Sequence, residues 1–180
     1  MFVPISTDGF TSRIDGDIGW TLRYLKGPDY GFNHFLDSID GVLFNRSHYT
    51  TLQSYDFKWL YGDLPCYVVT PKPFPHPLSQ KLQFLLTEED EKFSEHRLLN
   101  ELPPETEDIW LAGDNELISQ FLEMGLVDEM TLLILPVILD TGIPLISCRH
   151  NERCWQLTEK TEYGNGVFKL AYTRKKEAYS

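Results

Sequence analysis

The sequence predicts an α/β fold: a mixed, mostly parallel central sheet flanked by helices, with an antiparallel hairpin at the C-terminus. Three observations support this prediction. Residues 130–139 form an apolar run without polar alternation, which is typical of a strand covered on both faces. Residues 109–125 have the pattern of a strand, a turn and a helix. Residues 164–166 are a Gly-Asn-Gly turn between two segments with alternating apolar residues, as in a β-hairpin.

The strand–turn–helix segment contains recognisable start and stop signals. Residues 109–112 are expected to form the strand, and Gly113 the turn. Asp114 or Asn115 can cap the helix, since a side-chain oxygen at this position accepts a hydrogen bond from the first turn. Gly125 is well placed to end the helix. The buried face of the helix is expected to contain Leu117, Ile118, Phe121 and Leu122.

The N-terminal half contains shorter elements of the same kinds. Residues 29–40 include four apolar side chains at offsets of 0, 3, 4 and 7, which predicts one apolar helix face. These residues are Phe32, Phe35, Leu36 and Ile39. Strands are expected in the segments FVPIS, GVLF, CYVVT and LQFLL, and an exposed helix in TEEDEKFSEHRLLNEL.

The segment PKPFPHPLSQ, residues 71–80, alternates proline with other residues over most of its length. Proline has no N–H donor and a fixed φ, so the segment is neither a helix nor an inner strand. It is either a linker between two domains or a surface loop. We expect a surface loop in a single domain of residues 1–180, because neither flank alone has enough strands to close a core.

Composition and charge narrow the class of protein. Sixteen Lys and Arg residues against 27 Asp and Glu residues give a net charge of −11, which disfavours binding to nucleic acid, because such binding depends on neutralising phosphates. The apolar run is shorter than the ~20 residues that cross a bilayer, and no signal peptide pattern is found, so we expect a cytoplasmic protein without membrane contact. The cysteines and histidines have no metal-type spacing, and no metal site is expected.

Three predicted junctions between a strand and the following segment contain residues suited to an anion. They are Asn45-Arg46-Ser47 after GVLF, Thr70 after CYVV, and Gly113-Asp114-Asn115-Glu116 after IWLA. In open α/β sheets, ligands bind at the carboxyl ends of the strands, and N–H groups at a helix start suit phosphate. Arg46 adds a planar cation. The alternative is structural: Asp114 only caps its helix, and Arg46 only forms a surface ion pair.

The order of four parts of the chain resembles the dihydrofolate reductase-like superfamily. These parts are STDGF, IDGVLFNRSHYTTL, IWLAGDNELISQFLEMGLVDEMTLLILPVILDTGIPLI and the closing hairpin. More closely, the chain is similar to the RibD C-terminal reductase family, which includes stand-alone bacterial proteins. The resemblance implies an NADPH-dependent oxidoreductase, similar to that of riboflavin biosynthesis or to dihydrofolate reductase. It would transfer hydride to a pterin-, pyrimidine- or imine-like small molecule.

The resemblance also implies roles for particular residues. Cofactor phosphates would bind at the three junctions, with Thr70 near the adenosine 2′-phosphate. At the third junction, the family has a Gly-Gly pair joined by a cis peptide bond, which turns N–H groups toward the pyrophosphate. The implied cofactor-binding residues are Asn45, Arg46, Ser47, Thr70, Gly113, Asp114, Asn115 and Glu116. Ser6, Gly9 and Trp20 would contact the substrate, and Asp8, Asp29 or an ordered water would supply the proton.

Two departures from the family pattern leave a second class of function open. Asn45 replaces the usual Gly, and Asp114 replaces the second Gly of the pair. A carboxylate at a helix start favours the helix dipole but repels a pyrophosphate. A reductase is expected, and the alternative is a non-catalytic ligand-binding or regulatory module on the same fold. Because family members commonly pair, we expect a homodimer that uses the aromatic C-terminal hairpin.

Overall fold

The computed structural model describes residues 1–55, 59–87, 100–147 and 152–175. The chain folds as two compact units. Met1–Tyr30 and Phe121–Ser180 form the first unit, and Gly31–Gln120 forms the second. The first unit therefore contains segments from both ends of the chain. The expected single domain over the whole chain stays a prediction.

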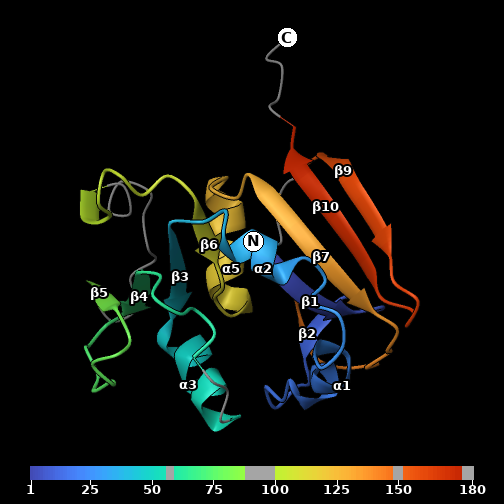
Figure 1. Ribbon diagram of the computed structural model, residues 1–180, viewed down its shortest axis with the longest axis horizontal. Coiled ribbons are helices and arrows are strands. Elements are labelled where there is room, and N and C mark those ends of the chain that lie inside the picture. The colour runs from blue at the N-terminus through green and yellow to red at the C-terminus, as the bar shows by residue number, and fades with distance from the viewer. Residues whose placement is uncertain (56–58, 88–99, 148–151, 176–180) are drawn as a thin grey trace. The chain divides into compact units, whose positions relative to one another are not determined.

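A four-stranded sheet forms the centre of the first unit (Figure 1), in the order β1-β7-β10-β9. β1 runs parallel to β7, whereas β10 runs antiparallel to both β7 and β9. The strands are β1 (Phe2–Ser6), β7 (Glu129–Leu135), β9 (Trp155–Glu162) and β10 (Phe168–Arg174). The sheet is mixed, and its antiparallel part lies at the C-terminal hairpin, as predicted.

β7 is an inner strand, which explains its apolar sequence. It pairs with β1 on one side and with β10 on the other, and Leu133 and Leu135 are buried. The strand is shorter than the predicted 130–139 run, because Pro136 follows it and has no N–H for the ladder. Val137 then donates its N–H to the Leu135 carbonyl oxygen, and the chain turns.

The C-terminal hairpin is confirmed. β9 and β10 pair on either side of the Gly-Asn-Gly turn. Tyr163 donates its N–H to the Val167 carbonyl oxygen, and Gly166 donates its N–H to the Tyr163 carbonyl oxygen. Gly166 has a φ of +82°, which glycine adopts without the steric cost of a Cβ atom. Shorter elements of this unit are β2 (Phe10–Ser12), its antiparallel partner β8 (Ile143–Pro144), the 3-10 helix η1 (Gly19–Thr21) and α1 (Leu22–Leu25).

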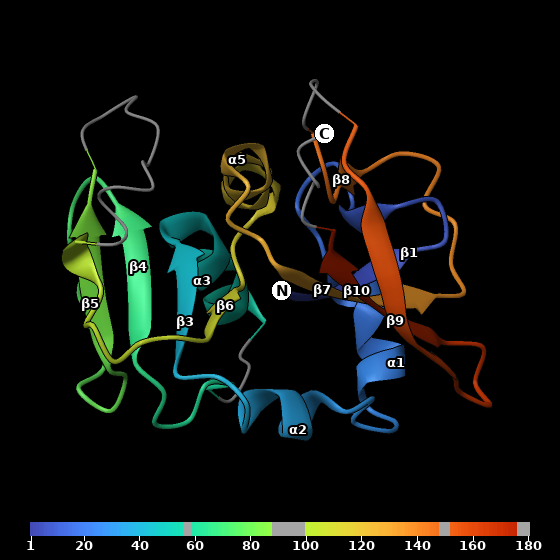
Figure 2. The same cartoon turned by 90° about the horizontal axis from the view of Figure 1, so that it is seen from above.

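Figure 2 shows the sheet of the second unit, in which four strands follow the order β5-β4-β3-β6. All neighbouring strands in it are parallel. The strands are β3 (Gly41–Asn45), β4 (Cys66–Thr70), β5 (Leu82–Leu86) and β6 (Ile109–Leu111), and the helices include α2 (Phe32–Leu36) and α3 (Arg46–Ser54). The proline segment 71–80 joins two paired strands, so it is a loop within one unit. Most of the helix expected in residues 87–102 lies outside the described residues.

α2 has the apolar face that the sequence predicts. Phe32 and Phe35 pack edge-on against Trp110 of β6, with ring centroids 5.4 and 5.3 Å away. Asn33 and His34 are exposed. The helix therefore covers β6 with its aromatic residues and turns its polar residues to solvent.

α5 (Asn115–Met124) begins and ends at the predicted residues. Asp114 Oδ1 accepts a 3.1 Å hydrogen bond from the Leu117 N–H, which is the contact of an N-cap residue. At the other end, Gly125 donates its N–H to the Leu122 carbonyl oxygen, and Leu126 donates to that of Phe121. This pair of bonds is the Schellman arrangement. The four residues of the expected face are all buried: Leu117, Ile118, Phe121 and Leu122.

Gly125→Ala is expected to lower the free energy of unfolding by about 1–2 kcal/mol, because Gly125 has a left-handed φ of +72° and a Cβ atom is disfavoured there. The added Cβ would also lie 3.0 Å from Arg174 Nη1. Urea denaturation followed by circular dichroism measures the change. Gly164→Ala is the control, since a Cβ at Gly164 meets nothing within 4 Å. Equal losses in the two variants would contradict this account of the helix end.

Candidate functional site

A pocket of about 270 Å³ opens in the second unit, where β3 and β4 end and α3 and α5 begin. Parallel strands present their carboxyl ends at the same edge of a sheet, so the segments that follow them meet there. Five of the residues expected to bind the cofactor line this pocket together: Asn45, Arg46, Ser47, Thr70 and Glu116. Thr87 and Gln120, which the sequence did not single out, add polar residues to its wall.

Asn45 connects two helix starts at this pocket. Its Oδ1 accepts a hydrogen bond from the His48 N–H, 3.3 Å away, and so caps α3. The same oxygen accepts a second bond, of 3.4 Å, from the Asp114 N–H just before α5. Because the amide oxygen is turned toward these two N–H groups, the Nδ2 group is the part of the side chain left to donate to a ligand.

Arg46 is the first residue of α3 and is exposed at the pocket. Its guanidinium carbon lies 5.3 Å from the centroid of the Phe74 ring, which is within the range of a cation–π contact. No acidic residue in the described part of the chain lies within ion-pair distance of Arg46. The described contact of this side chain is therefore with an aromatic ring and not with a carboxylate.

Thr70 is the last residue of β4, and its side chain is buried. Its hydroxyl donates to the Lys72 carbonyl oxygen at 3.0 Å and accepts from the Lys72 N–H at 3.4 Å. A side-chain to backbone bond of this kind stabilises a turn. Thr70 therefore shapes the pocket wall at the point where the chain leaves the sheet.

The third junction differs from the pattern of the family. No cis peptide bond occurs in the described residues, so the Gly113–Asp114 bond is trans, unlike the cis bond that the resemblance associates with the family's Gly-Gly pair. The Asp114 carboxylate caps α5 through the Leu117 N–H. Gly113 is needed for close packing, because a Cβ there would lie 2.5 Å from Leu117 Cδ2. Gly113, Asp114 and Asn115 are not among the described residues that line the pocket.

His48 and Tyr61 form a contact that sequence reasoning missed. His48 Nε2 and the Tyr61 hydroxyl lie 2.8 Å apart in a hydrogen bond. Burial lowers the pKa of His48 to about 4, although the Asp114 carboxylate acts in the opposite direction, and burial raises the pKa of Tyr61. Both groups are therefore neutral at neutral pH. They link α3 to the core beside the pocket, and a lone His and Tyr give no sequence pattern for such a contact.

In the first unit, the STDG loop is bonded to the turn that follows β7. The Asp8 carboxylate accepts hydrogen bonds from the N–H groups of Leu139 and Asp140, at 3.2 and 2.9 Å. The pKa of the Asp8 carboxyl is lowered, most by the hydrogen bond with the Ser6 side chain and less by the bonds from these N–H groups. Gly9 lies in the same loop with a φ of +87°. Asp8 is therefore ionised at neutral pH and has a structural role in this turn.

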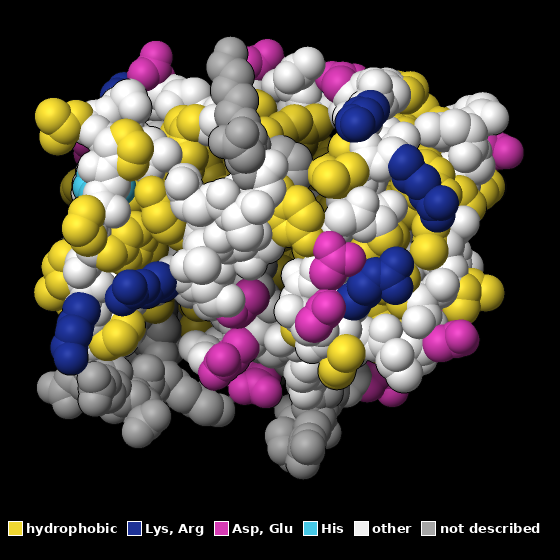
Figure 3. Space-filling model, turned by 90° about the horizontal axis from the view of Figure 1, so that it is seen from below, with side chains coloured by type: hydrophobic (Ala, Val, Ile, Leu, Met, Phe, Trp, Pro, Cys, Tyr) yellow, Lys and Arg dark blue, Asp and Glu magenta, His cyan; other side chains and the backbone are white. Residues whose placement is uncertain are grey.

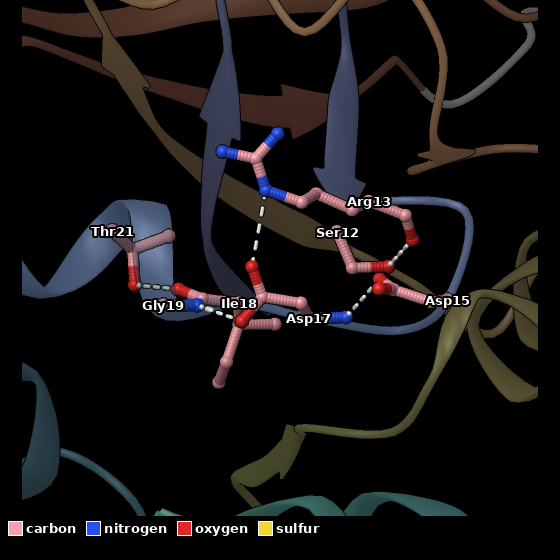
Figure 4. Close-up of polar contacts among 7 residues, drawn as sticks. All are labelled: Ser12, Arg13, Asp15, Asp17, Ile18, Gly19 and Thr21. Atoms are coloured by element: carbon pink, nitrogen blue, oxygen red, sulfur yellow. Dashed lines mark hydrogen bonds and ion pairs between the residues drawn. The ribbon is translucent and has the colours of Figure 1, made fainter.

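The loop through residues 16–20, which leads to Trp20, is held by its own polar groups (Figure 4). Arg13 Nε lies 3.1 Å from Asp17 Oδ2 in an exposed ion pair. Asp17 Oδ1 accepts the Gly19 N–H at 2.9 Å, and Asp15 accepts the Asp17 N–H at 3.0 Å. These bonds fix the loop backbone on the N-terminal side of η1.

Trp20 and Asp29 differ in their access to solvent. Trp20 is buried, and its indole N–H has no hydrogen-bond partner within the described part of the chain, whereas Asp29 is exposed. Asp29 lies before α2, and not in that helix as expected. Both residues, like Ser6, Asp8 and Gly9, belong to the first unit, and the pocket belongs to the second. That the two groups form one site stays a prediction.

Basic side chains stand as separate groups on the face drawn in Figure 3, and they do not merge into one broad basic patch there. The described residues contain no group of three or more His, Cys, Asp or Glu residues that could hold a metal ion. Within the described ranges, no helix has the length and apolar character needed to cross a membrane.

Asp114→Ala is expected to lower the free energy of unfolding by about 1 kcal/mol, because it removes the oxygen that caps α5. Asp114→Asn is the matched variant: it keeps an oxygen in the same place, and its stability is expected to stay within ~0.5 kcal/mol of the parent. Chemical denaturation measures both changes. Equal losses of stability in Asp114→Ala and Asp114→Asn would show that Asp114 stabilises the helix through its negative charge and not through the capping hydrogen bond.

Two proteins of Bacillus subtilis (strain 168) are similar to this chain over nearly its whole length. The chain is 29% identical over 174 residues to the uncharacterized protein YwjB of Bacillus subtilis (strain 168), and the match covers 97% of this chain and 96% of YwjB. A second protein of that organism, the uncharacterized YyaP, is 28% identical over 189 residues, covering 94% and 91% of the two chains.

Three solved structures share the fold. A Shewanella sp. PV-4 protein assigned provisionally to riboflavin biosynthesis has a TM-score of 0.82 at 22% identity and covers 97% of each chain. A pyrimidine reductase-like protein from Corynebacterium diphtheriae has a TM-score of 0.68 at 13% identity, with 98% of this chain and 91% of that chain covered. A deaminase/5-amino-6-(5-phosphoribosylamino)uracil reductase from Thermotoga maritima has a TM-score of 0.68 at 13% identity, but only 55% of it is covered, against 96% of this chain.

The model of the RibD C-terminal domain family matches residues 42–169. This match spans most of the chain and includes the pocket residues, β9 and the hairpin turn, and it ends within β10. The described sheets, the strand order and the solved relatives are consistent with it. The chain is therefore a member of the RibD C-terminal domain family and has a fold of the riboflavin-pathway reductase type.

Proposed function

We propose that this protein is an NADPH-dependent reductase that transfers hydride to a C=N or C=C bond of a pterin-, pyrimidine- or imine-like small molecule. The observation that supports the proposal is the pocket of the second unit, where Asn45, Arg46, Ser47, Thr70 and Glu116 meet. These residues follow parallel strands at the starts of helices, which is where open α/β sheets bind nucleotide phosphates. Membership of the RibD C-terminal family supplies the class of reaction.

The pocket residues fit a phosphate group. Arg46 is exposed there and offers a planar set of donors to an anion. Within α3, the Asn45 side chain accepts a hydrogen bond only from the His48 N–H. The N–H groups of Arg46 and Ser47, the first two residues of this helix, are therefore available to an anion. Glu116 opposes a phosphate by its charge, but it is exposed and its carboxylate can turn to water. We place the adenosine 2′-phosphate in this pocket, between Arg46 and the wall formed by Thr70.

When bound, NADPH supplies the hydride, and the protein contributes position and the exclusion of water. We assign contact with the substrate to Ser6, Gly9 and Trp20 of the first unit. The buried indole N–H of Trp20 has no partner among the described residues, and an acceptor on a ligand would satisfy it. Asp8 is held ionised and carries no proton to deliver at neutral pH. We therefore assign the proton to an ordered water beside one of the two carboxylates, Asp8 or Asp29.

A non-catalytic ligand-binding or regulatory module is the second candidate function. The Gly113–Asp114 bond is trans, as this candidate requires, but the Asp114 carboxylate caps α5 and does not line the pocket. A titration with NADPH, followed by an assay of NADPH oxidation with pterins and pyrimidines, separates the two candidates. Binding of NADPH with turnover supports the reductase. Binding of a pterin or pyrimidine with no binding of NADPH supports the module.

Arg46→Ala is expected to weaken NADPH binding by about 1.5–3 kcal/mol, the scale of a hydrogen bond to a charged group, with little change in melting temperature. Isothermal titration calorimetry and a thermal melt measure the two effects. Arg23→Ala is the matched control, because Arg23 also lies over an aromatic ring, 4.9 Å from the Tyr24 centroid, but belongs to the first unit. Unchanged binding with a lower melting temperature would make Arg46 a structural residue.

We also propose that the protein is a homodimer that pairs through β9. This strand is bonded only to β10 within the described sheet, and an edge strand offers unpaired N–H and C=O groups. Leu157 of β9 is 48% exposed, so an apolar side chain is available at this edge. The structural alternative, that the hairpin aromatics only face their own core, does not explain this exposure.

Light scattering at micromolar concentration is expected to give twice the mass of the 20.9 kDa chain. Leu157→Glu is expected to shift the mass toward the monomer, because it places a charge in the contact. Ile146→Glu is the control, since Ile146 is similarly exposed, at 45%, but does not belong to the sheet. A monomer mass for the parent protein would rule the dimer out.

A further inference from the structure

The proline loop, residues 71–80, makes an unusual connection between two parallel strands. Parallel neighbours need a crossover that returns the chain along the sheet, and this crossover is usually a helix. Here it contains prolines at positions 71, 73, 75 and 77 and no helix or strand. Each proline has a fixed φ and no N–H that requires a partner. The loop is therefore stiff without regular secondary structure.

Phe74 is the aromatic residue that this loop turns toward the sheet. It stands between Pro73 and Pro75, both of which are exposed, whereas Phe74 is half-buried. Its ring packs against Tyr49 of α3, 4.8 Å away between centroids, and against Phe84 of β5, 5.0 Å away. The neighbouring prolines restrict the backbone of Phe74, and the rings of Tyr49 and Phe84 restrict its side chain. Together these constraints fix the position of the Phe74 ring.

The ring of Phe74 is also the described contact of the Arg46 guanidinium, at 5.3 Å. A long arginine side chain has many rotamers, and a ligand that binds only one of them loses affinity because the side chain loses conformational entropy. The negative face of an aromatic ring attracts a cation and limits those rotamers before a ligand arrives. Arg46 lines the same pocket as Thr70, which directly precedes the proline loop, and Pro71, the first residue of that loop.

We propose that Phe74, fixed by the proline loop, is a positioning residue that holds Arg46 ready for the 2′-phosphate and so sets a preference for NADPH over NADH. This inference rests on the proposed function. The two nucleotides share the pyrophosphate and differ in the 2′-phosphate, so a change in the position of Arg46 weakens NADPH alone. A ring that only fills space in the core would affect both nucleotides equally.

The test is the ratio of the NADH and NADPH dissociation constants, measured by calorimetry for the full chain. Phe74→Leu is expected to weaken NADPH binding about threefold to tenfold, the scale of a partly desolvated cation–π contact, and to leave NADH binding unchanged. Phe74→Tyr keeps the aromatic face and is expected to retain the parent ratio. Phe35→Leu is the packing control, because Phe35 belongs to the same unit and contacts Trp110 outside the pocket.

The outcomes separate this inference from the proposed function. If the parent binds neither nucleotide, the proposed function fails, and the inference fails with it. If the parent prefers NADPH and Phe74→Leu keeps that preference, or if the parent has no preference, only the inference is overturned. Equal weakening of both nucleotides would also overturn it. Should Phe74→Leu not fold, Phe74→Met replaces the ring with a flexible apolar side chain that adapts to the gap, and the same loss of preference is expected from it.

Discussion

The two hydrogen bonds of the Asn45 amide oxygen are the constraint on which the pocket depends. One bond caps α3 through His48, and the other reaches Asp114 before α5, 69 residues away in the chain. A single atom therefore holds two helix starts next to each other. Removing it would leave two N–H groups without this partner, and a buried unpaired N–H costs roughly 1–3 kcal/mol. This contact joins the two segments that contain Arg46 and Glu116, which the paired strands β3 and β6 already bring to the same edge of the sheet.

The two departures from the family pattern are linked by the same bond. Asn45 and Asp114 stand where the resemblance to the family implies glycines, and the side-chain oxygen of Asn45 accepts a hydrogen bond from the backbone N–H of Asp114. The Asp114 carboxylate in turn caps α5 through Leu117, which directs its charge to the helix dipole. The two replacements are therefore one rearrangement that stabilises both helix starts. Arg46 remains exposed at the pocket beside this bond.

Aromatic packing extends this constraint through the second unit. Trp110 contacts Tyr61, Tyr61 contacts Phe44, and Phe44 stacks on Tyr49, with ring centroids 5.4, 5.5 and 6.5 Å apart. Tyr49 then packs against Phe74 at 4.8 Å. Rings of this size contribute much of the apolar area that a core buries, and their contacts are directional. A series of ring contacts thus connects the core of this sheet to Phe74, whose ring contacts the Arg46 guanidinium at the pocket.

The sequence by itself determined the elements whose signals are local. The cap at the start of α5, the helix end at Gly125, the presence of an inner strand from about residue 130 and the Gly-Asn-Gly hairpin all depend on residues within a few positions of each other. Five of the eight residues that the resemblance implied for the cofactor line one pocket, because they lie at the ends of predictable strands or at the starts of the helices that follow, and their role stays a proposal. Only the tertiary structure decided the shared bond of Asn45, the ring beneath Arg46 and the structural role of Asp8. These contacts join distant segments, and packing of the whole unit selects them, so no local pattern records them.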